Sequence, residues 1–161
     1  MDKHSAVFRN LISIIVAFGL FAGVTYAGEA LCFQCAIASE EHTAAEGAVS
    51  IMENGSTLTY RIVVHHLEDI TMAHLHLGKA GDIGSPVVWL YPPGPPPRLI
   101  PGKFEGVLAE GTITRDDLIG PMRGRPLESL IAEMRKGNVF LNIHTKTHAQ
   151  GEFCGLVPIA K

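Results

Sequence analysis

The sequence contains no run of basic residues: its 13 lysines and arginines are dispersed, and the formal net charge is −3. A protein that binds nucleic acid by neutralising phosphates needs a clustered positive surface. Nucleic acid is therefore excluded as an expected partner. The sequence also places no serine, cysteine or carboxylate in a nucleophile motif, so an enzymatic role is not favoured.

Long apolar runs are absent as well, apart from one near the N-terminus at 11–24. Lys3 and Arg9 precede this run, and a small residue before a polar turn follows it, which is the order of a secretory signal peptide. The run is too short for a comfortable membrane span. The sequence therefore predicts a signal peptide at 1–27 and a single domain at 28–161. The expected location is secreted, periplasmic or otherwise extracytoplasmic, with membrane contact only if the signal segment stays uncleaved as an anchor.

Cysteine is scarce, and all three cysteines lie in the part expected to be exported: Cys32, Cys35 and Cys154. An odd count in an oxidising compartment leaves one thiol outside any single internal bridge. A bridge between Cys32 and Cys154 would join the first strand to the last, contribute about 2–4 kcal/mol, and leave Cys35 free. The sequence leaves open which of Cys32 and Cys35 pairs, if either does. Their spacing is that of a redox motif, but the βαβ context of such a motif is absent.

Apolar and polar residues alternate over several short segments bounded by turn residues, a pattern typical of β-strands. Asn54-Gly55 is a strong hairpin signal, because a tight primed turn needs positive φ. Only 126–136 has helical periodicity, beginning with proline and ending before Gly137. The expected fold is all-β, an antiparallel β-sandwich with this one short helix. The expected strands are 48–52, 57–67, 71–77, 87–91, 103–114, 139–144 and 152–157, with loops at 78–85 and 92–97.

Histidine is the residue type whose pattern suggests chemistry. His74 and His76 alternate with apolar residues, so in a strand both rings project from one face. A second pair, His144 and His148, lies in another strand-like run about seventy residues later. If the fold brings the two pairs together, they predict a copper or zinc site, because neutral imidazole nitrogen is a ligand of both metals.

A second interpretation of these histidines stays open. In this framework interpretation, His74 and His144 are structural residues that donate hydrogen bonds to backbone carbonyls across the sandwich. On the metal interpretation, Glu152 or Asp82 would orient a ring through a hydrogen bond. The neighbouring histidines at 65–66 are expected to be solvated on either interpretation.

Several short motifs occur in an order typical of a known family. They are 73–78 (Ala-His-Leu-His-Leu-Gly), 104–108 (Phe-Glu-Gly-Val-Leu), 111–114 (Gly-Thr-Ile-Thr), 117–121 (Asp-Leu-Ile-Gly-Pro), 142–145 (Asn-Ile-His-Thr) and 151–153 (Gly-Glu-Phe). Through them the chain, from about Phe33 to Val157, resembles the CHRD domain, which is named after chordin and also occurs alone in exported bacterial and archaeal proteins. The resemblance implies an immunoglobulin-like β-sandwich, distantly similar to copper–zinc superoxide dismutase. Two positions depart from the family pattern: Cys154 stands where an arginine is usual, and 41–44 replaces Glu-Val-Pro-Pro.

Two functions follow as expectations. The first is a non-enzymatic extracytoplasmic binding module for an unidentified protein or surface ligand, with copper or zinc at the histidine cluster. The second, suggested by the similarity to superoxide dismutase, is a dismutase-like or copper-handling protein that uses His74, His76 and His144. A dismutase-type zinc site is not expected, because no single long loop contains a second set of histidines with an aspartate.

Overall fold

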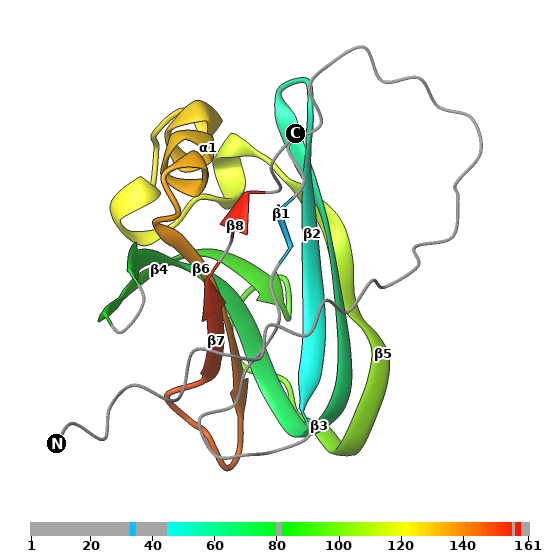
Figure 1. Cartoon of the computed structure of the whole chain (residues 1–161). Helices are drawn as coiled ribbons and strands as arrows, with labels where there is room; N and C mark the ends of the chain where they lie inside the picture. The colour runs from blue at the N-terminus through cyan, green and yellow to red at the C-terminus, as the bar shows by residue number, and fades with distance from the viewer. Residues whose placement is uncertain (1–32, 35–44, 80–81, 156, 159–161) are drawn as a thin grey trace, which may run out of the picture.

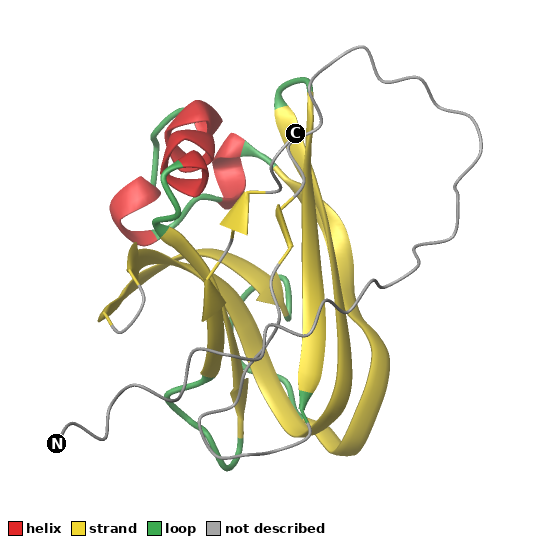
Figure 2. Cartoon of the chain, in the orientation of Figure 1, coloured by secondary structure: helices red, strands yellow, loops and turns green. Residues whose placement is uncertain are grey.

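The chain folds as an antiparallel β-structure in the computed structural model (Figure 1). The structure describes residues 33–34, 45–79, 82–155 and 157–158. Within these residues strands predominate and one short α-helix is present, which confirms the expected all-β sandwich (Figure 2). The elements are β1 (Phe33–Gln34), β2 (Glu46–Asn54), β3 (Thr57–Lys79), β4 (Asp82–Tyr91), β5 (Ile100–Ile113), η1 (Arg115–Asp117), η2 (Gly120–Met122), α1 (Leu127–Arg135), β6 (Val139–Thr145), β7 (Glu152–Gly155) and β8 (Val157–Pro158).

The longest strand, β3, belongs to both layers of the sandwich (Figures 1 and 2). Its residues 57–65 pair with β2 on one side, and its residues 58–70 pair with β5 on the other. Further along, residues 70–79 pair with β6 and β4, and β7 extends this second layer beyond β6. One strand therefore bends from the first layer into the second and connects them covalently.

The bend in β3 replaces the interruption that the sequence predicts between strands 57–67 and 71–77. That prediction is wrong, because the intervening residues stay paired with β5, so the strand continues through shifts of register. Two non-glycine residues at the bend, His66 and Asp69, have positive φ values of 59° and 52°. Irregularities of this kind let a strand turn a corner between two sheets.

Asp69 holds this corner through its side chain and its backbone. Its Oδ1 accepts a hydrogen bond from Gly102 N at 2.7 Å, and its carbonyl oxygen accepts one from Lys146 N at 3.0 Å. The hydrogen bond from Gly102 is the main cause of the lowered pKa of the Asp69 carboxyl. Lys146 lowers this pKa further, whereas partial desolvation raises it. Asp69 therefore connects the bend of β3 to β5 and to the segment after β6.

Asp69→Ala is expected to unfold at a lower urea concentration than the wild type. Alanine offers no acceptor to Gly102 and adopts a left-handed backbone poorly. Asp69→Asn keeps an oxygen acceptor and a residue type that adopts positive φ more readily, so its midpoint should stay close to that of the wild type. Urea titration followed by tryptophan fluorescence measures both midpoints. An unchanged midpoint in Asp69→Ala would show that the corner does not depend on this side chain.

The hairpin predicted at Asn54-Gly55 connects β2 to β3. Asn54 pairs with Thr57, so the loop consists of Gly55 and Ser56, and Gly55 has a φ of 61°. Glycine with positive φ at the first of two loop positions is the arrangement of a primed turn. The hairpin prediction is confirmed, with the loop beginning one residue after Asn54.

The two predicted loops differ in outcome. The segment 78–85 is largely strand, because Gly78 pairs with Ile83 and Lys79 with Asp82, so its prediction as a loop is wrong. The proline-rich segment 92–97 contains no strand or helix, as expected from residues that lack an amide donor.

The predicted helix is confirmed as α1. Pro126 and Lys136 cap it, and Gly137 follows with a φ of 73° and an amide that donates to Met134 O. Its buried face consists of apolar residues at helical spacing: Leu127, Leu130, Ile131 and Met134. Among the described residues, no helix has the length and hydropathy needed to cross a membrane.

The second layer is buried on both faces. Ala73 and Leu75 of β3 point into the core with 0% exposure. His74 and His76 point away from that core and are nevertheless only 5% and 7% exposed. All seven residues of β6 are buried. Polar side chains on the outer face of this layer must therefore find hydrogen-bond partners or a ligand.

Two predictions fall on residues or side chains whose placement the structure does not describe. The signal peptide at 1–27 and the cysteines Cys32 and Cys35 lie outside the described residues. Cys154 lies in β7, with its side chain outside the described part. The signal peptide and the Cys32–Cys154 bridge therefore stay predictions.

Candidate metal centre

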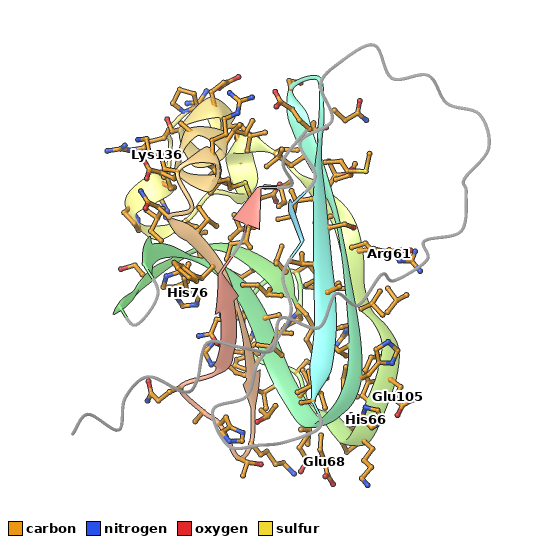
Figure 3. All side chains as sticks on the ribbon, in the orientation of Figure 1. Arg61, His66, Glu68, His76, Glu105 and Lys136 are labelled. Atoms are coloured by element: carbon orange, nitrogen blue, oxygen red, sulfur yellow. The ribbon has the colours of Figure 1, made fainter. Side chains whose placement is uncertain are left out.

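Three of the four predicted histidines meet on the outer face of the second layer. His74 and His76 come from β3 and His144 from β6, and one ring nitrogen of each lies within 4.8 Å of the other two. His74 Nδ1 and His144 Nε2 are 3.3 Å apart. Figure 3 shows His76 on the side of the molecule that carries β4 and β6. The antiparallel pairing of β3 with β6 thus assembles a cluster from residues that are 70 positions apart.

The other histidines lie elsewhere. His148, the fourth predicted ligand, follows the end of β6; its amide donates to Thr145 Oγ1 at 3.0 Å, and its Nδ1 is 3.5 Å from the same oxygen. It does not belong to the three-nitrogen group. His65 and His66 are exposed, as expected, and His66 lies 3.6 Å from Glu105 at the far end of the sheet (Figure 3).

Two backbone carbonyls orient the rings of His76 and His144. His76 Nδ1 lies 2.9 Å from Gly84 O, and His144 Nδ1 lies 3.0 Å from Ala149 O. A carbonyl oxygen only accepts hydrogen bonds, so each Nδ1 carries the proton and each Nε2 presents its lone pair. Proteins orient metal-binding histidines with hydrogen bonds of this type.

The segment that supplies Ala149 is itself held against β6. Asn142 Nδ2 donates to Gln150 O at 3.1 Å, and Gly151 N donates to His148 O at 2.8 Å. A Cβ at position 151 would collide with the Asn142 side chain. Glycine at this position therefore lets the segment lie close enough to β6 for Ala149 to reach His144.

Burial keeps the rings of His74 and His76 neutral. It lowers the pKa of His74 to about 4, and the neighbouring His144 and His76 add to the effect. Burial also lowers the pKa of His76; the hydrogen bond to Gly84 opposes this shift, and His144 adds to it. Both rings are therefore uncharged at pH 7, which is the state that binds a metal ion.

Three buried side-chain atoms in the described part of the structure have no hydrogen-bond partner, and all belong to this region: His74 Nε2, His76 Nε2 and Asn142 Oδ1. Leaving a buried polar atom unpaired costs about 1–3 kcal/mol. The framework interpretation explains the bonds from His76 and His144 to carbonyls, and also the contact between His74 Nδ1 and His144 Nε2, which is within hydrogen-bond distance. It does not explain why the lone pair of His76 Nε2 is buried without a donor, whereas a bound ion does.

The spacing of two of the nitrogens fits such an ion. Two imidazole nitrogens, each about 2.05 Å from a tetrahedral ion, lie about 3.3 Å apart. His74 Nδ1 and His144 Nε2 are separated by 3.3 Å, and His76 Nε2 is the third donor. The buried group of His74, His76 and His144 can therefore hold one metal ion, and three protein ligands leave a further coordination position open.

A family model for the CHRD domain matches residues 34–157. The chain belongs to the CHRD domain family. The match includes the motifs at 73–78 and 142–145, which place the three histidines on β3 and β6 of this CHRD domain. No curated protein and no solved structure matches the chain.

Trp89 completes the surroundings of the cluster in this CHRD domain. Its ring packs edge-on against His74, with ring centroids 4.1 Å apart and planes at 83°. The two residues are opposite each other in the pairing of β3 with β4. The chain contains one tryptophan, so its fluorescence is a specific reporter of this site.

Sequence reasoning did not find Gly84, Ala149 or Trp89. The groups that orient the rings are backbone carbonyls, which leave no side-chain pattern. A glycine within a strand often marks a close backbone approach, and this was the one available signal for Gly84. The orienting residues that the sequence suggested, Glu152 and Asp82, have side chains outside the described part of the structure.

Gly84→Ala is expected to weaken metal binding about 10–100-fold. A Cβ at position 84 would collide with the carbonyl oxygen of Leu77, so β4 would shift and carry Gly84 O away from His76. Gly94→Ala is the matched control, because a Cβ there meets nothing within 4 Å. Competition with a chromophoric chelator measures both affinities. Equal affinity in Gly84→Ala and the wild type would contradict the role of this carbonyl.

Proposed function

We propose that this CHRD domain is an extracytoplasmic metal-binding module that holds one copper or zinc ion on His74, His76 and His144. The observation that carries the proposal is the convergence of three buried imidazoles, two of them oriented by backbone carbonyls. No carboxylate or thiolate among the described residues joins the group. Nitrogen-only ligands suit copper and zinc, whereas magnesium and calcium require oxygen.

The extracytoplasmic location rests on the signal-peptide order of residues 1–27. An oxidising compartment would allow the bridge between Cys32 and Cys154 and leave Cys35 free. The dispersed charge of the chain suits a protein or surface ligand better than nucleic acid.

Metal analysis of the purified chain tests the proposal. After incubation with copper or zinc and removal of free ions, mass spectrometry should find about one ion per chain. Cu(II) should also quench Trp89, because the ion would bind next to the ring that contacts His74. A chain that retains no metal and keeps its Trp89 emission at millimolar copper would reject the proposal.

A superoxide-dismutase-like or copper-handling activity is the second candidate. It is favoured because three protein nitrogens leave a further coordination position of the metal unfilled by the protein. Copper supplies one-electron chemistry when bound, and zinc does not. Superoxide removal by the copper-loaded chain, compared with the zinc-loaded chain, tests this candidate; equal rates would exclude it.

A further inference from the structure

Among the side chains that the structure describes, none adds a negative charge to the histidine cluster that could balance a cation. Its three donors are neutral nitrogens, and no carboxylate or thiolate among the described residues joins them. His74, His76 and His144 are only 5%, 7% and 8% exposed. The cost of moving an ion from water into such surroundings rises with the square of its charge, so a divalent ion costs about four times as much as a monovalent one of the same size.

The candidate ions also differ in the number of ligands that they require. Zn(II) in a closed protein site is almost always four-coordinate, and Cu(II) prefers four ligands in a square or tetragonal arrangement. Among the nearby polar side chains of the described residues, Asn142 Oδ1 faces Gly151 and has no hydrogen-bond partner, and His148 Nδ1 is next to Thr145 Oγ1, outside the three-nitrogen group. Cu(I) has a closed d shell and accepts three nitrogen donors without a fourth ligand.

Two described residues beside the cluster, Trp89 and Met72, have polarizable and uncharged side chains. The indole of Trp89 packs against His74, with ring centroids 4.1 Å apart. Met72 lies two residues before His74, on the same face of β3, and pairs with His144 across the two strands. Aromatic faces and thioether sulfur interact favourably with soft monovalent cations and add little to the binding of hard divalent ones.

We infer that this site selects copper in its reduced state, Cu(I), over Cu(II) and Zn(II). The inference deepens the proposed metal site and rests on it. Tighter binding of the reduced ion raises the reduction potential of the bound copper, by about 59 mV for each tenfold difference in Kd.

Competition experiments on the purified chain test the inference. Bicinchoninate competes for Cu(I) under anaerobic, reducing conditions, and separate chelators compete for Cu(II) and Zn(II) in air. Trp89 emission is recorded in each titration, because it senses an ion next to His74. Cys32, Cys35 and Cys154 are Cu(I) ligands in their own right. They are therefore alkylated beforehand, and a chain with all three replaced by serine is measured in parallel.

A Kd for Cu(I) at least about a hundredfold lower than the Kd for Cu(II) and for Zn(II) supports the inference. X-ray absorption at the copper edge should then show three nitrogen donors and no fourth ligand. If Cu(II) or Zn(II) binds at this site as tightly as Cu(I), the inference is wrong while the proposed metal site stands. If no ion is retained and none changes Trp89 emission, both are wrong.

Discussion

Copper or zinc should no longer raise the melting temperature of the His74→Ala/His76→Ala variant. In the wild type, an ion at a hundred times its Kd stabilises the folded chain by about 2.7 kcal/mol. That energy corresponds to a rise of roughly 5–10 °C in a domain of this size. The variant removes two of the three nitrogen donors, so it should show no shift. Thermal melting with and without saturating metal measures the difference.

His65→Ala/His66→Asn is the matched control for this experiment, because it also removes two histidines from β3. Both residues are exposed and lie outside the cluster, and asparagine tolerates the positive φ at position 66. The control should keep the full metal-dependent shift. If the shift survives in His74→Ala/His76→Ala, the metal binds elsewhere on the chain.

The metal-free protein should lose stability as the pH falls from about 6.5 towards 4. Burial lowers the pKa of His74 from 6.5 to about 4. Between these values the unfolded chain binds a proton that the folded chain does not, so falling pH favours unfolding. For this one ring the loss is on the order of 3 kcal/mol. The pKa of His76 is lowered by the same burial, so its effect has the same sign.

His74→Gln isolates this contribution, because glutamine keeps a polar side chain of moderate size but does not titrate. Urea unfolding of both chains at pH 7 and at pH 4.5 measures the loss of stability in each. Asp69 and Glu133, whose pKa values are also lowered, titrate in both chains and cancel in the comparison. An equal loss in both chains would mean that His74 is not held neutral by burial.

Local patterns were sufficient to predict the elements that depend on residues close together in sequence. The turn after Asn54, the helix α1 and the shared face of His74 and His76 all belong to this group. The bend in β3 could not be predicted in this way. His66 and Asp69 carry no local signal for positive φ, because their conformation depends on pairing with β5 and on contacts with the segment after β6.

The candidate site was predictable only in part. The residue types and the alternation of His74 and His76 indicated a metal site, but the approach of His144 depends on a strand pairing across 70 positions. His148 looked equivalent in sequence because it lies only four residues beyond His144. In a continuous strand, residues four positions apart project from the same face. β6 ends at Thr145, so this alternation does not extend to His148.

The placement of β3 at the centre of both layers has a kinetic consequence. His74 and His76 share one strand, whereas His144 joins them only after β6 has paired with β3. Contacts between residues so distant in sequence form slowly, because the chain must first lose the conformational entropy of the long loop between them. A newly made chain would therefore offer two donors at first and the third only when the sandwich closes. Bound metal should then leave the folding rate unchanged and lengthen the lifetime of the native state.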